Sequence, residues 1–267
     1  MTSFFKLFSA ATLILGLGSI ILYPHVNTAQ PSNNTFQQKV AENAIQEWIS
    51  FNAPNRPVVR SQADVALLER EPLEYRKCQT INRYWAVVPV NQSGDNKPPS
   101  GDSCKLNIPP TPQGKGQIGK WNEYPWSAAF ISYIMQKSGA GNQFKYSGRH
   151  ATYIVDSVKN RDTQNYPFRG YPIDQKEPEI GDLICAPRGS SKDLVYDKIL
   201  QEGDFTSHCD IVVAKNDNKN IEVIGGNVGD TVSKTIVLLN SKGYIQKTDS
   251  HSDFRPWFVV IKNTLRP

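Results

Sequence analysis

The hydrophobic pattern of the chain changes its period near Pro178, and this change limits the folds that the chain can adopt. Before Pro178, apolar residues recur three or four positions apart, which predicts helices at 35–51, 61–71, 126–138 and 147–158. After it, short β-branched segments bounded by turn residues predict strands at 181–186, 208–214, 221–224, 232–239 and 257–261. Helices followed by a run of strands are the order of an α+β fold with an antiparallel sheet.

The segment 1–29 is separate from this fold. Lys6 is the one Lys, Arg, Asp or Glu in a leader whose apolar run extends from Leu7 to Tyr23 and is followed by small residues. This layout is typical of a secretory signal peptide, so we expect export to the periplasm or the extracellular space. The run also reaches the lower length limit of a transmembrane helix, and an uncleaved membrane anchor is therefore the alternative.

The remaining chain divides at about residue 120. We expect residues 30–119 to hold N-terminal helices and a long loop, because 89–119 is rich in Pro, Gly, Ser and Asn. Residues 120–267 are expected to form the main domain. The content of 39% hydrophobic residues and five tryptophans is sufficient for a core. The net charge of +5 is spread along the chain and does not indicate nucleic-acid binding.

The four cysteines form an even set, as expected in an oxidising compartment, and they allow three pairings. We favour Cys78–Cys104 and Cys185–Cys209. Cys185 and Cys209 each lie in a predicted strand, and their β-carbons can approach within bonding distance if the strands are neighbours. A bond from Cys78 to Cys104 would tether the loop at 89–119. Two buried free thiols at the strand positions are the alternative.

Ser127 is the candidate nucleophile. It follows Pro125 and Trp126, so it falls in the first turn of a predicted helix, close to backbone amides that have no acceptor within the helix. Such amides can stabilise the oxyanion formed during acyl transfer to a serine. The alternative is that Ser127 caps the helix with its hydroxyl, a common role for serine.

Two histidines could act as the general base for this serine. His208 begins a predicted strand, and His150 lies in the first turn of a predicted helix. Asp210 would share a strand face with His208, because side chains two positions apart point the same way. The alternative for each histidine is a structural, hydrogen-bonded role at the end of an element.

Two further polar residues are candidates. Asn227 lies in a glycine-flanked segment after a strand, from which it could orient an imidazole, although a tight turn with a left-handed asparagine is the more frequent explanation. Glu123, just ahead of the helix, could contribute a carboxylate. No cluster of His, Cys and Asp has the spacing of metal ligands, so we expect neither a metal nor a cofactor.

Five segments occur in an order that resembles the DUF2272 family, a bacterial group of uncharacterised function. They lie between about residue 120 and residue 262, at 125–132, 150–154, 181–185, 208–212 and 225–228. That family in turn resembles the CHAP and NlpC/P60 amidases, which are papain-like peptidoglycan hydrolases. The resemblance implies a papain-like antiparallel sheet or half-barrel. It also implies peptidoglycan or a peptide as partner. From the charge pattern we expect no nucleic acid, and from the leader we expect membrane contact only through an uncleaved N-terminal segment.

The resemblance also implies roles for three residues. By position, Ser127 stands where those enzymes have their cysteine, His208 where they have their histidine, and Asn227 near their third residue. A helix dipole and an imidazolium can ionise a thiol, but a serine hydroxyl must pass its proton to a base as the new bond forms.

Three functions follow from these observations. The first is hydrolysis of cell-wall peptide or amide bonds through a Ser–His site. The second is an inactive domain that retains the cleft and binds a peptide or glycan. The third is chemistry without a covalent intermediate, carried by residues such as His150, His208, Asp210 or Glu123.

Overall fold

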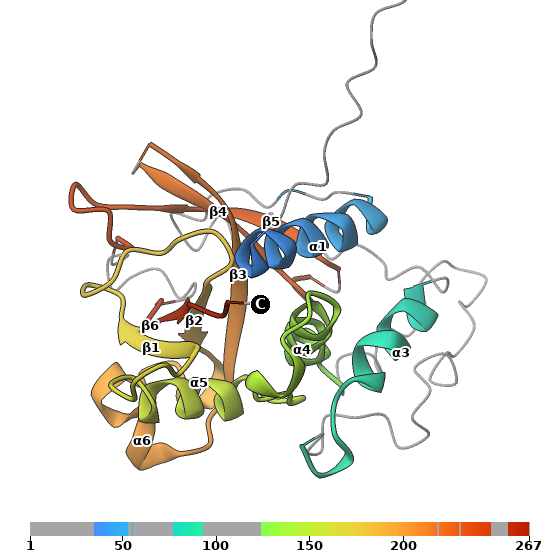
Figure 1. Cartoon of the computed structure of the whole chain (residues 1–267), viewed down its shortest axis with the longest axis horizontal. Coiled ribbons are helices and arrows are strands. Elements are labelled where there is room, and N and C mark those ends of the chain that lie inside the picture. Colours follow the sequence, from blue (N-terminus) through green and yellow to red (C-terminus); the bar gives the residue numbers. More distant parts are fainter. Residues whose placement is uncertain are drawn as a thin grey trace, which may run out of the picture. The chain divides into compact units, whose positions relative to one another are not determined.

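The computed structural model describes residues 35–52, 55, 77–92, 124–217, 219–229, 231–246 and 256–266. These residues belong to the unit Asn34–Pro267. Within them lie five α-helices and a six-stranded antiparallel sheet, which confirms the α+β class (Figure 1). The predicted signal segment and the predicted helix at 61–71 lie outside the described residues. Within the described ranges, no helix is both long and apolar enough to span a bilayer.

The helices are α1 (Phe36–Ser50), α3 (Cys78–Ala86), α4 (Ser127–Lys137), α5 (His150–Lys159) and the short α6 (Ile199–Glu202). Helices α1, α4 and α5 lie at segments predicted from the apolar periodicity, whereas α3 and α6 were not predicted. Single 3-10 turns occur at Val90–Gln92, Gly141–Gln143, Gly189–Ser191 and Tyr196–Lys198. Thr35 begins α1 with a reciprocal capping box, in which its hydroxyl accepts from the Gln38 amide and the Gln38 side chain accepts from the Thr35 amide.

The sheet has the strand order β1-β6-β2-β3-β4-β5, and every neighbouring pair is antiparallel. Its strands are β1 (Phe168–Pro172), β2 (Leu183–Pro187), β3 (Ser207–Asn216), β4 (Asn220–Gly225), β5 (Ser233–Leu238) and β6 (Val259–Asn263). The edge strand β1 was not predicted from the sequence, because a glycine and a proline interrupt its short pattern.

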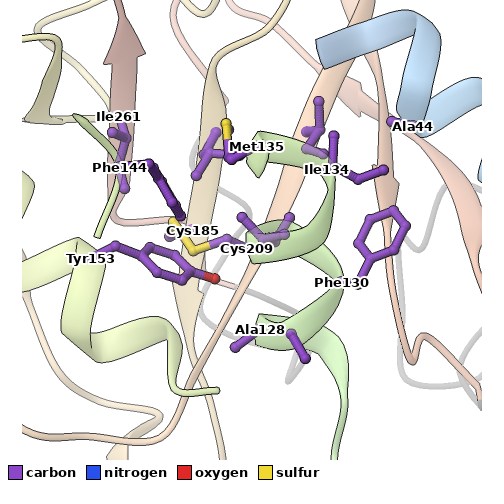
Figure 2. Packing of buried hydrophobic residues seen from close by; sticks show 14 of the residues in the cluster. Ala44, Ala128, Phe130, Ile134, Met135, Phe144, Tyr153, Cys185, Cys209 and Ile261 are labelled. Atoms are coloured by element: carbon purple, nitrogen blue, oxygen red, sulfur yellow. A yellow bond between two sulfur atoms is a disulfide. The ribbon is translucent and has the colours of Figure 1, made fainter. Parts of the chain in front are cut away.

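Two hydrophobic clusters cover the two faces of the sheet. Helices α1, α4 and α5 pack against β3, and their apolar residues join Cys185 and Cys209 in the larger cluster. Figure 2 shows Phe130, Ile134 and Met135 of α4 within this cluster. The second cluster contains the intervening strand residues, among them Ile184, Val212, Val223 and Val260. This alternation is the period of two expected of strands buried on both faces.

A disulfide joins the two central strands. Cys185 on β2 lies directly opposite Cys209 on β3, with 4.1 Å between their α-carbons. This confirms the predicted pairing and its reason, since the two strands are neighbours. Cys78 is also disulfide-bonded. Its predicted partner, Cys104, lies outside the described residues.

Asp182 ties the start of β2 to the end of β6. Its carboxylate accepts hydrogen bonds from the Asn263 amide at 2.8 Å and the Glu179 amide at 2.7 Å, and it forms an ion pair with Lys262. The side chain is almost fully buried, and this desolvation raises the pKa of Asp182 to about 6 despite the opposing effects of Lys262 and the two amides.

The raised pKa gives a signed prediction for stability. Between about pH 4 and pH 6 the folded protein binds a proton at Asp182 more tightly than the unfolded chain does. The free energy of unfolding should therefore fall as the pH rises through this window, by at most about 3 kcal/mol from this group. Asp182→Asn should flatten this dependence in urea titrations at pH 4, 5 and 6. Parallel curves for the two proteins would contradict the prediction.

Candidate active site

Five polar side chains from α4, α5 and β3 meet in the interior at one end of the sheet. All are buried, with exposed fractions between 1% and 5%. They are Ser127, His150, Tyr153, His208 and Asp210. Buried polar groups are costly unless they are hydrogen-bonded, so a cluster of this kind requires specific partners.

Ser127 is the first residue of α4, and its hydroxyl lies 2.7 Å from His150 Nε2. The interpretation of Ser127 as a helix cap is wrong. Trp126 occupies the cap position and makes no side-chain capping bond, while the serine hydroxyl turns toward α5. The first backbone bond of the helix runs from the Phe130 amide to the Trp126 carbonyl, so the amides of residues 127–129 have no acceptor within the helix.

His150 is the first residue of α5, and both of its ring nitrogens lie against hydroxyls. Nε2 contacts Ser127, and Nδ1 is hydrogen-bonded to the Tyr153 hydroxyl one turn later. Figure 2 shows the Tyr153 ring beside the disulfide, with its hydroxyl directed away from the backbone of α5. Burial, together with the negative charge of Asp210, raises the pKa of Tyr153 well above its ordinary value, so the phenol stays neutral.

The tautomer of His150 determines whether its Nε2 can accept the proton of Ser127. If Nδ1 carries the proton and donates it to the Tyr153 oxygen, Nε2 can accept the proton of Ser127. In the other neutral tautomer Nε2–H donates to the serine, and no base is available. Tyr153 therefore occupies the position from which a side chain orients a general base.

His208 forms a second pair beside the first. Its Nε2 lies 2.7 Å from Asp210 Oδ1, which confirms that the two side chains share a strand face. The rings of His208 and His150 are 5.2 Å apart, centroid to centroid. The histidine at hydrogen-bond distance from Ser127 is therefore His150. His208 packs its ring against the ring of His150.

Two consecutive glycines leave room for this arrangement. A β-carbon on Gly225 would lie 1.9 Å from Asp210 Oδ1 and 2.9 Å from His208 Nε2. A β-carbon on Gly226 would lie 2.5 Å from the β-carbon of Phe130 on α4. Since real side chains do not approach so closely, the end of β4 can pass between the histidine–aspartate pair and α4 only without side chains.

The helix α5 is held beside α4 by a serine pair. Ser132 Oγ donates to the Ser147 carbonyl at 2.9 Å and accepts from the Ser147 amide at 3.0 Å. Ser147 Oγ then accepts from the Arg149 amide, so the chain enters α5 in a fixed direction. These bonds bring the N-termini of the two helices together, which sets the contact between Ser127 and His150.

The other sequence-derived candidates lie elsewhere. Asn227 has a left-handed backbone, with φ of 57°, as its turn alternative predicts. It is not among the side chains hydrogen-bonded to either histidine in the described part of the chain. Glu123 lies outside the described residues. Among the residues that the structure does describe, no group of three or more His, Cys, Asp and Glu side chains could hold a metal ion.

Tyr153 is the site residue that sequence reasoning missed. Its spacing provided a signal, because residues three apart on a helix are neighbours on the same face. Tyr153 follows His150 by that interval on a predicted helix, so a contact between the phenol and the imidazole was available from the sequence.

Comparison with known families identifies the family of the chain. The family model described as "Uncharacterized protein conserved in bacteria (DUF2272)" matches residues 75–263 of the 267-residue chain. The chain therefore belongs to the DUF2272 family. The match begins upstream of residue 120 and includes α3 as well as the site. No curated protein and no solved structure matches the chain.

The glycine pair provides a test of the packing. Gly226→Ala should reduce the free energy of unfolding by about 1–3 kcal/mol, because α4 or the end of β4 must move to admit the methyl group. Gly203→Ala is the control, since that glycine has φ of +68° but open space around it, and should lose only about 1 kcal/mol. Urea denaturation measures both. An equal or smaller loss at Gly226 would contradict the close packing.

Proposed function

We propose that the protein is an exported hydrolase that cleaves peptide or amide bonds of the bacterial cell wall, with Ser127 as nucleophile and His150 as general base. The observation that carries the proposal is the 2.7 Å distance between Ser127 Oγ and His150 Nε2 at the start of α4. A hydroxyl in contact with an imidazole, which is itself held by a third group, is the arrangement that activates a serine.

In the proposed reaction, Ser127 Oγ attacks the substrate carbonyl carbon while its proton passes to His150 Nε2. In the productive tautomer the Tyr153 oxygen accepts a hydrogen bond from His150 Nδ1–H, which leaves Nε2 free to take the proton. The amides of residues 127–129 are suited to stabilise the oxyanion. The proton then moves from His150 to the departing amine, and water, deprotonated by His150, releases the acyl group from the serine.

The substrate class rests on the resemblance of the DUF2272 segments to CHAP and NlpC/P60 amidases. A nucleophile-bearing helix packed on an antiparallel sheet is compatible with the papain-like fold of those enzymes. Export is supported by the leader sequence and by the disulfide Cys185–Cys209, since such bonds persist in oxidising compartments. His208 matches their histidine by position, but we assign the direct base role to His150 because of its contact with the serine.

A second candidate function is binding of a peptide or glycan without turnover. The observation that favours it is the burial of Ser127 and His150, which limits access of a substrate to the nucleophile. A neutral phenol also stabilises an imidazolium less than a carboxylate would.

The nucleophile can be tested by release of soluble fragments from purified sacculi. Ser127→Ala should reduce release to background, because no acyl-serine can form, whereas Ser127→Cys should retain measurable turnover. Ser157→Ala is the matched control, since Ser157 is a buried serine whose hydroxyl donates to the Ile154 carbonyl of its own helix. It should keep wild-type activity.

Two outcomes would contradict the proposal that the protein is a hydrolase with Ser127 as nucleophile. Equal release by Ser127→Ala and the wild type would exclude the serine as nucleophile. Binding of the wild type to sacculi without any release would favour the second candidate.

The orienting role of Tyr153 gives a separate prediction. Tyr153→Phe keeps the ring and removes the hydroxyl, so His150 Nδ1 loses its hydrogen-bond partner on α5. We expect kcat to fall by about 10- to 100-fold with KM nearly unchanged, because the effect lies in proton transfer and not in binding. A rise in KM at constant kcat would instead indicate a role of the phenol in substrate binding.

A further inference from the structure

The segment that connects β2 to β3 contains a cleft of about 380 Å³, which we call the 188–206 cleft. All of its lining residues come from this one segment, and none of them belongs to the candidate active site. Three are apolar, three are charged, and the others carry a hydroxyl or an amide. Clefts of this volume, with apolar walls and a few polar groups, are typical of sites for small ligands.

The walls of the 188–206 cleft are fixed to the rest of the domain. Ile199 anchors α6 in the core, where it is fully buried. The buried ring of Phe205 packs against Phe258, with 6.0 Å between the ring centroids. The two ends of the segment are joined, because the Thr206 amide donates to Ser191 Oγ at 3.2 Å. The cleft is therefore preformed, so a ligand does not have to order the segment when it binds.

The charged side chains of the 188–206 cleft are Asp193, Lys198 and Glu202. Within the described part of the chain, none of the three forms an ion pair. Lys198 Nζ instead donates to Gln201 Oε1 at 3.2 Å. Two carboxylates against one ammonium leave an excess of negative charge, which favours a ligand with a positive group. The ammonium of Lys198 has further protons to donate to an oxygen of that ligand.

The apolar side chains of the 188–206 cleft determine what carries this positive group. They are Leu194, Val195 and Phe205. Val195 has an exposed fraction of 57%, so its side chain is available to a ligand. Apolar surface beside carboxylates matches a flexible alkyl chain that ends in a charge, because the chain can lie on the apolar wall while the charge reaches the polar groups.

We propose that the 188–206 cleft binds a peptide through an aliphatic ammonium group, of the kind that a lysine side chain carries. The alkyl chain lies along Val195 and the other apolar residues, and the ammonium pairs with Asp193 and Glu202. Lys198 donates to a backbone carbonyl of the peptide. Each of these contacts uses a group that lines the cleft and has no ion-pair partner of its own among the described residues.

The 188–206 cleft is also tied to the start of α5. Helix α6 packs against α5 (Figure 1). Arg149 donates to both carboxylate oxygens of Asp204, at 2.7 Å and 2.6 Å. Arg149 directly precedes His150, and Asp204 directly precedes Phe205 of the cleft. The binding of a peptide here is independent of the proposed function, and only the use of the cleft as a substrate subsite rests on it.

The proposal is tested by NMR titration with two capped tripeptides, acetyl-Ala-Lys-Ala-amide and the same peptide with norleucine in place of lysine. The caps leave the lysine side chain as the one charged group, and the Ser127→Ala protein prevents turnover. The lysine peptide should shift backbone amide signals of residues 190–205. The norleucine peptide has an alkyl side chain without the charge, so it should bind about tenfold more weakly.

Asp193→Asn and Glu202→Gln should each weaken binding of the lysine peptide about fivefold, because each removes one charged partner of the ammonium. Asp197→Asn is the matched control, since Asp197 is an exposed carboxylate of the same segment that does not line the cleft, and it should leave the affinity unchanged. All three side chains are exposed, so the variants should fold as the wild type does.

Three results would overturn the proposal: equal affinity for the two peptides, equal weakening by Asp197→Asn, or signal shifts confined to residues outside the segment. The comparison of the two peptides needs no variant of the cleft. Peptide binding without release of fragments from sacculi would contradict only the hydrolase function. Release of fragments without peptide binding would contradict only the proposal for the 188–206 cleft.

Discussion

The antiparallel pairing of β2 with β3 fixes the positions of the two strand residues of the site, His208 and Asp210. Its register sets Cys185 opposite Cys209 and Ala186 opposite His208, so the disulfide holds the position directly beside the histidine. Asp210 then follows on the same face as His208 and lies against the end of β4. A shift of the register by one residue would turn both side chains to the other face of the sheet. The covalent bond therefore protects the geometry of the histidine–aspartate pair.

The helices supply the opposite half of the site, and they supply it through their N-termini. Both α4 and α5 begin at site residues, Ser127 and His150, so two positive helix ends meet the cluster. Asp210 adds a buried carboxylate to the cluster, and its negative charge contributes to the raised pKa of Tyr153. Under the proposed function, the free amides at the start of α4 favour a negative charge where an oxyanion would form.

The sequence predicted those parts of the site that follow from local patterns. The period of two along β3 was sufficient to place His208 and Asp210 together, and neighbouring strands were sufficient to pair Cys185 with Cys209. The edge strand β1 was missed, because its pairing with β6 joins distant segments and its own pattern is weak. The histidine that meets Ser127 was also not determined by the sequence, since that contact depends on tertiary bonds between α4 and the entry to α5.

Under the proposed function, a serine at position 127 sets a requirement on the base that contacts it. A cysteine enzyme can rest as a thiolate beside one imidazolium, because the thiol is acidic enough to lose its proton before the reaction. A serine cannot do so and needs a neutral base in contact with it at the moment of attack. Under the proposed function His150 is placed for this task, because its Nε2 lies 2.7 Å from the Ser127 hydroxyl. Under the proposed function, the serine therefore depends on His150 and on the phenol bonded to that ring.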